Sequence, residues 1–93
     1  MAKIFVTNHE RVSDAKLFKV DREREADIII FIVKNEREAK GDALWYFVER
    51  ERDASFKVFW AKYEREADIK VFIADRDRYA KWAKSNRFQN RIG

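Results

Sequence analysis

The sequence predicts a mainly β fold of the α+β class, built from six repeated strand-plus-turn units, with a short C-terminal helix. Three observations predict it. A pattern of thirteen residues recurs along the chain, the third place of every copy is aromatic, and the eighth and ninth places are an acid followed by arginine. Such self-similarity is typical of equivalent units that bury their apolar faces against one another.

The copies begin at residues 3, 16, 29, 44, 57 and 70, and the third copy is lengthened by Gly41 and Asp42. The aromatic third place holds Phe5, Phe18, Phe31, Tyr46, Phe59 and Phe72. The eighth place holds Glu10, Glu23, Glu36, Glu51, Glu64 and Asp77, and the ninth holds Arg11, Arg24, Arg37, Arg52, Arg65 and Arg78. The eleventh place is Ala26, Ala39, Ala54, Ala67 and Ala80, with Ser13 in the first copy.

The first five places of each copy predict a strand. Thirteen residues make about 3.6 turns of α-helix, so the aromatics of one continuous helix would not line a single stripe. Segments such as IIFIV and LWYFV are instead rich in β-branched and aromatic residues, which suit a pleated buried surface. Both faces are apolar in copies three to six, so we expect these strands to be covered on both sides. Lys19 predicts an edge strand in copy two, and the polar first copy predicts an edge or a frayed end.

The second half of each copy predicts a single helical turn. Glu, Arg and Ala favour helix, and Asp21 or Asn35 could cap it. Gly41 and Asp42 predict a turn that lengthens one connection. Residues 76–85 favour the C-terminal helix, with Tyr79 and Trp82 on one packed face. The last residues are expected to lie along the surface, anchored by Phe88 and Ile92.

Composition indicates one domain, residues 1–93. Hydrophobic residues make up 46% of the chain, which is enough for a small core, and charged residues make up 41%. The chain has no Cys, which excludes disulfides and thiolate chemistry. No apolar run approaches a membrane span, and the start MAKIFVTN lacks a signal-peptide core, so we expect a cytoplasmic protein.

Catalytic signals are weak. His9 is the single His, and Ser13 lies four residues away, but a serine nucleophile needs its base within hydrogen-bond reach. The repeated acids Glu23, Glu25 and Asp27 could serve acid–base catalysis or bind a divalent cation, yet they alternate with arginine. The sequence therefore predicts a non-enzymatic protein with no metal site and no cofactor.

The basic residues suggest a second possibility. Residues 1–77 hold 16 Lys and Arg against 17 Asp and Glu, whereas residues 78–93 hold five bases and no acid. These bases, which could grip a nucleic-acid or other polyanion backbone, are Arg78, Lys81, Lys84, Arg87 and Arg91. The competing interpretation is a packed tail whose charges meet solvent. The ninth-place arginines could likewise bind phosphates, but pairing with the eighth-place acids is favoured, as is core packing for the third-place aromatics.

The copies KVFIADRDRYA and KVFWAKYEREADI, with the end AKWAKSNRFQNRIG, resemble the septoil-knot family of small bacterial proteins of unknown function. The resemblance implies a two-layered, mostly β fold whose tail threads past earlier copies in a seven-crossing torus knot. An open, unknotted two-sheet β-solenoid is the alternative. A knot would imply slow unfolding and high kinetic stability. We expect a monomer of unknown biological role.

Overall fold

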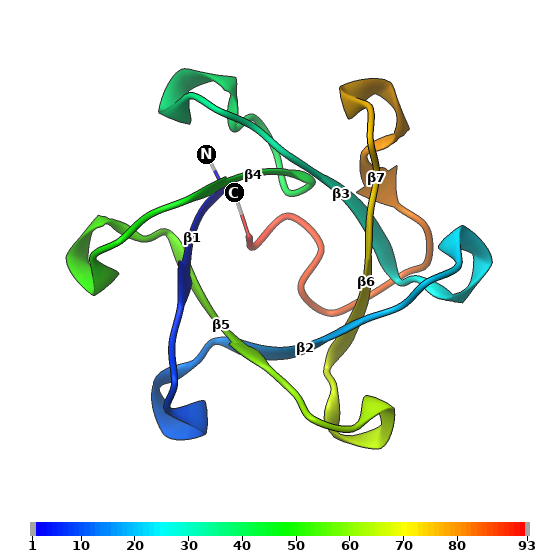
Figure 1. Ribbon diagram of the computed structural model, residues 1–93, viewed down its shortest axis with the longest axis horizontal. Coiled ribbons are helices and arrows are strands. Elements are labelled where there is room, and N and C mark those ends of the chain that lie inside the picture. Colours follow the sequence, from blue (N-terminus) through cyan, green and yellow to red (C-terminus); the bar gives the residue numbers. More distant parts are fainter. Residues whose placement is uncertain (1, 93) are drawn as a thin grey trace.

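The computed structural model describes residues 2–92, and six of its seven strands carry the repeat. Each of these six strands is followed by a single turn of 3-10 helix. The strands are β1 (Ala2–Val6), β2 (Ala15–Lys19), β3 (Ile28–Ile32), β4 (Leu44–Phe47), β5 (Phe56–Trp60), β6 (Ile69–Ile73) and β7 (Lys81–Trp82). The turns are η1 (Glu10–Val12), η2 (Glu23–Glu25), η3 (Glu36–Glu38), η4 (Glu51–Asp53), η5 (Glu64–Glu66) and η6 (Asp77–Tyr79). The turns form the points of a six-armed star around the strands (Figure 1).

The first six strands close into a parallel barrel. The strand order is β4-β1-β5-β2-β6-β3-β7, and β3 also pairs directly with β4, which completes the ring. Strand β7 adds two residues antiparallel to β3. In this order of seven strands, each strand lies two positions beyond the strand that precedes it in sequence. The count continues from the seventh position back to the first. Every turn except η3 therefore carries the chain over one intervening strand of the barrel, whereas η3 joins β3 to its direct neighbour β4.

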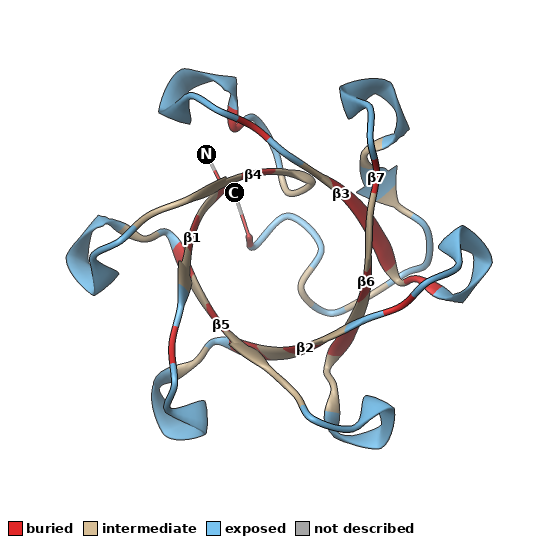
Figure 2. Ribbon diagram, viewed as in Figure 1, coloured by how far each residue is buried: buried red, intermediate tan, exposed pale blue. Residues whose placement is uncertain are grey.

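Small and aliphatic side chains fill the barrel from two places of the repeat. The residue at the second place of one copy lies opposite a thirteenth-place residue, which stands just before the first place of the neighbouring strand's copy. Ile4 lies opposite Phe56 in this way, and Leu17 lies opposite Ile69. Both places are buried, whereas the arms are exposed (Figure 2). Trp45, fully buried, is the largest of these side chains, and its indole Nε1 donates to the Asp42 carbonyl oxygen at 2.6 Å. The barrel interior is therefore the main core.

The third-place aromatics were expected in the core: within residues 2–92 none of them belongs to the main core, and Phe18 and Phe72 pack against a second, smaller core cluster. All six are half-buried, because strand alternation turns them away from the barrel axis. They lie beneath the arms instead: Phe18 and Phe72 pack against the second cluster, Val20, Ala26, Ile29 and Ala74. The small eleventh-place Ala26 allows the turn to approach the strand at this point.

The twelfth place fixes the register between neighbouring strands. The Asp14 Oδ2 accepts a hydrogen bond from the Lys57 amide at 2.8 Å, and the Asp14 amide donates to the Lys57 carbonyl at 2.7 Å. Asp27 makes the same reciprocal pair with Lys70. Asp68 clamps Lys16 in this way, and Ser55 clamps Lys3 through its hydroxyl. A side chain just before one strand therefore holds the second residue of the neighbouring strand in the barrel.

The third copy departs from this pattern at the inserted residues Gly41 and Asp42, and Asp42 binds the C-terminal tail. Gly41 has a φ of +69°, a conformation that glycine adopts readily, and it opens the turn predicted there. The Asp42 carboxylate accepts hydrogen bonds from the Trp82 indole and from the amides of Asn90 and Ile92. The tail thus crosses the centre of the ring at the N-terminal ends of the strands (Figure 1). Ile92 is fully buried in the main core and Phe88 packs against it, so the predicted anchors are confirmed.

The predicted fold class is wrong in its arrangement. The strands form one closed barrel rather than two layers, and within residues 2–92 no helix exceeds a 3-10 turn. The expected C-terminal helix is replaced by η6 and β7, so Trp82 packs on the core while Tyr79 remains exposed. The two expected edges are also wrong, because β1 pairs with β4 and β5, and β2 pairs with β5 and β6. Closure gives each strand of the barrel two neighbours, which the polar residues of the first two copies could not reveal.

Candidate anion-binding groove

The five predicted basic residues do not form one stripe. Arg78 lies at the exposed tip of η6, with its guanidinium 5.1 Å from the Tyr79 ring centre. Arg87 pairs with Asp68 at 3.1 Å and stacks on Phe88. Arg91 is exposed near the end of the tail. Only Lys81 and Lys84 share a hollow of the surface.

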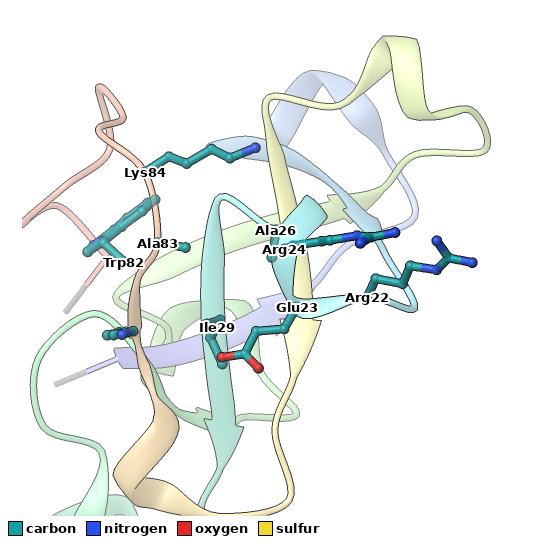
Figure 3. A pocket seen from close by; sticks show the side chains of 9 residues that line it. Arg22, Glu23, Arg24, Ala26, Ile29, Trp82, Ala83 and Lys84 are labelled. Atoms are coloured by element: carbon teal, nitrogen blue, oxygen red, sulfur yellow. The ribbon is translucent and has the colours of Figure 1, made fainter.

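That hollow, the basic groove, lies between η2 and the segment that follows η6. It has a volume of about 770 Å³ and is lined by Arg22, Glu23, Arg24, Ala26, Ile29, Lys81, Trp82, Ala83 and Lys84. Figure 3 shows Arg22 and Arg24 on the side of the groove opposite Trp82, Ala83 and Lys84. Sequence reasoning missed Arg22, and it considered Arg24 only as one of the six ninth-place arginines, for which pairing with the neighbouring acids was favoured over phosphate binding.

The groove exists because one copy breaks the repeat. In three copies the eighth-place acid is bridged by the lysine six residues later: Glu10 with Lys16, Glu51 with Lys57, and Glu64 with Lys70. Six residues after Glu23 stands Ile29, which is buried and has no charge. The segment after η6 lies beside Ile29, because β7 pairs with β3. Lys81 lies opposite Ile29, and Trp82 lies opposite Ile28. Ile29 therefore gives the groove an apolar floor at the position where those three copies have an ion pair.

The charge of the groove is one-sided. Four cations line it against a single carboxylate. A second hollow has Arg37 and Lys40 against Glu38 and Asp77, and a third has Lys3 and Arg50 against three acids. Within residues 2–92, none of the four groove cations takes part in an ion pair. Their charges therefore remain available to a ligand.

The ninth-place arginines were expected to pair with the eighth-place acids, but lysines pair with four of those six acids, Glu10, Glu36, Glu51 and Glu64. Lys3 bonds Glu36 at 2.6 Å and Lys16 bonds Glu10 at 2.8 Å. These hydrogen-bonded carboxylates raise the pKa of Lys3 and of Lys16 above the usual value of 10.5. No ninth-place arginine joins an ion pair within the described chain, and Arg65 instead lies 4.9 Å from the Tyr63 ring centre.

The candidate catalytic pair is not assembled. The Ser13 hydroxyl donates to the Glu10 carbonyl oxygen at 2.7 Å, so its proton is held by the backbone rather than by an imidazole. His9 is exposed, and its backbone amide donates to the Thr7 hydroxyl. Over residues 2–92, no three His, Asp or Glu side chains gather as metal ligands.

The same residues contain no helix of the length and apolar character needed to cross a bilayer.

The fold defines a class of wound barrel: six parallel strands close the ring, β7 is added beside β3, and in this order of seven the chain advances two places from one strand to the next. The chain belongs to the 7(1) septoil knot domain family, whose model matches residues 1–83. The resemblance drawn from the repeat is thereby confirmed. The step of two around seven strands is the winding of a seven-crossing torus, which agrees with the family description. No curated protein and no solved structure matches this chain.

Proposed function

We propose that this domain binds the phosphate backbone of a nucleic acid in the basic groove and acts by binding rather than by catalysis. One observation carries the proposal: four cations that have no ion-pair partner within residues 2–92 line an apolar floor, against a single carboxylate. Guanidinium groups bind phosphate through paired N–H donors, and lysines add point charge.

Neutralising the groove tests the proposal. A short fluorescent single-stranded oligonucleotide is titrated with the intact chain and with the double variant Arg24→Gln/Lys84→Gln, at low and physiological salt. Binding to the intact chain should weaken steeply as salt rises, because phosphate contacts release counterions. The variant should bind about tenfold more weakly or worse.

The matched control is Arg11→Gln/Arg52→Gln, which removes the same charge from the exposed tips of η1 and η4. This variant should retain most of the affinity. Equal losses in both variants would indicate a diffuse charge effect, and an absence of binding at low salt would overturn the proposal.

A second proposal concerns stability: the domain unfolds unusually slowly. Two features support it. Five of the six turns pass over an intervening strand of the barrel, and the tail docks beside β1, where Ser55 accepts from the Lys3 amide and donates to the Ile92 carbonyl oxygen. Unfolding then requires the tail to leave the ring before the strands can separate, so operational stability is governed by a rate.

A further inference from the structure

One wall of the basic groove is a short segment, residues 81–84, which a two-residue ladder joins to the barrel. Lys81 and Lys84, both exposed, carry the positive charges of this wall. Strand β7 pairs with β3 through two residues, and the amides of Ala83 and Lys84 donate to the Asp27 carbonyl oxygen at 2.8 and 3.1 Å. Because so short a pairing is marginal on its own, the position of the wall depends on further contacts.

Asp42 supplies such a contact from the other side of the wall. Lys81 and Trp82 line both the basic groove and a neighbouring hollow that also contains Asp42 and Asn90. The Trp82 indole donates to the Asp42 carboxylate at 2.8 Å, and its ring packs against the main core. The same carboxylate accepts the tail amides of Asn90 and Ile92. The groove wall and the docked tail therefore share one acceptor.

The opposite wall of the groove is built by the repeat itself. Arg22 and Arg24 belong to the turn η2, which the Ala26 amide closes by donating to the Glu23 carbonyl oxygen at 3.1 Å. Each of the six copies forms such a turn. Asp42, in contrast, is one of the two inserted residues of the third copy. The separation between the two pairs of cations is therefore set by one repeat-built wall and one wall held through Asp42 (Figure 3).

We propose that Asp42 is a positioning residue for the basic groove, which holds Lys81 and Lys84 in place for a phosphate backbone through its bond to Trp82. The inference rests on the proposed function, since it names what sets the affinity of that same site. Asp42 itself lies outside the lining of the groove. Its negative charge repels a polyanion, so removing the charge alone should tighten binding. Loss of the wall should weaken binding, which gives the two effects opposite signs.

Two variants of equal charge test the proposal by titration of the fluorescent single-stranded oligonucleotide at low salt. Asp42→Ala removes both acceptor oxygens, whereas Asp42→Asn keeps one for the Trp82 indole. Asp42→Ala should bind about fivefold more weakly than the intact chain, the loss expected if the wall is in place for about one-fifth of the time. Asp42→Asn should bind with an affinity between those of the alanine variant and the intact chain.

Two controls separate positioning from charge and from general instability. Asp53→Ala removes an acid from the exposed turn η4 and should bind no more weakly than the intact chain. Val58→Ala weakens the main core on β5, the strand across the barrel from β3, and should leave the affinity unchanged. Circular dichroism confirms that each variant is folded. An Asp42→Ala variant that binds as tightly as Asp53→Ala overturns the proposal, and so does an equal loss in Val58→Ala.

Amide hydrogen exchange without any ligand distinguishes a failure of this inference from a failure of the proposed function. In Asp42→Ala the amides of Ala83 and Lys84 should exchange faster than in the intact chain, whereas the Ala26 amide of the opposite wall should keep its rate. Unchanged exchange at Ala83 and Lys84 overturns the positioning role, even if the intact chain binds the oligonucleotide. An intact chain that binds no oligonucleotide overturns the proposed function, while faster exchange at these two amides still establishes that Asp42 holds the wall.

Discussion

The Asp42 carboxylate accepts a hydrogen bond from the indole Nε1 of Trp82 at 2.8 Å. This contact joins the two departures from the repeat, the lengthened third copy and the C-terminal tail. The same carboxylate also receives the amides of Asn90 and Ile92. One side chain therefore satisfies three donors of the tail, and the docked tail covers one end of the barrel.

Replacing Asp42 by Ala should release the tail. Three donors lose a charged acceptor, and we expect a loss of about 2–4 kcal/mol in the free energy of unfolding, since bonds to charged groups contribute more than neutral ones. Urea unfolding followed by tryptophan fluorescence measures the loss, and amide exchange at Asn90 and Ile92 reports the release. Asp53→Ala, on the exposed turn η4, is the matched control. Equal losses in both variants would show that Asp42 does not hold the tail.

The clamp at the twelfth place predicts a graded substitution series. Asp14→Ala leaves the Lys57 amide without its side-chain acceptor and should cost about 1–2 kcal/mol of unfolding free energy. Asp14→Ser should cost less, because the repeat itself uses Ser55 to accept from the Lys3 amide at 2.9 Å. Urea unfolding of the three proteins gives the order. A serine variant as unstable as the alanine variant would show that the carboxylate, and not the acceptor position, is required.

Two lysines predict a loss of stability at alkaline pH. Bonds to Glu36 and Glu10 raise the pKa of Lys3 and Lys16 above 10.5, their value in the unfolded chain. The contribution of a group whose pKa is raised on folding is complete below pH 10.5 and disappears as pH rises through the folded value. The double variant Glu10→Gln/Glu36→Gln should therefore be slightly less stable than the intact chain at pH 8. Denaturant unfolding at pH 8 and above pH 11 should show this difference shrinking. A difference that persists unchanged above pH 11 would contradict the assignment.

The slow-unfolding proposal predicts a rate constant below about 10⁻⁵ s⁻¹ in water at 25 °C, at the slow end for small domains. Stopped-flow and manual-mixing unfolding in guanidinium, extrapolated to water, measure it. Ile92→Ala removes the buried end of the tail and should accelerate unfolding. A rate typical of small two-state domains, or an Ile92→Ala rate equal to that of the intact chain, would contradict the proposal.

The repeat predicted the strands well, because propensity and alternation are local properties. Strands β1, β2, β5 and β6 begin one residue before the first place of their copy, and β4 begins on it. Closure could not be predicted, since the pairing of β1 with β5 joins residues that are remote in sequence and carry no complementary signal. The twelfth-place aspartates bind the neighbouring strands, but their role as hydrogen-bond acceptors can be recognised only when the partner strand is known.

The candidate site was only partly predictable, for a similar reason. Lys81 and Lys84 were found from the local excess of positive charge in the tail. Arg22 was not recognised, and phosphate binding by Arg24 was set aside in favour of an ion pair, because in sequence each stands beside an acid. The signal that could have revealed the groove was Ile29, which occupies a place held by lysine in four other copies. Because no lysine stands six residues after Glu23, that acid has no ion pair within residues 2–92, and Ile29 leaves an apolar floor there.

The most direct test of binding in the basic groove is to locate the bound phosphate backbone on the molecule. A short single-stranded oligonucleotide is added to the ¹⁵N-labelled chain at low salt, and amide shifts are followed by NMR. Binding in the basic groove should move the amide signals of residues 22–26, Ile29 and residues 81–84, on both sides of the groove. Shifts confined to Arg87 and Arg91, spread evenly over the arms, or absent altogether would contradict it.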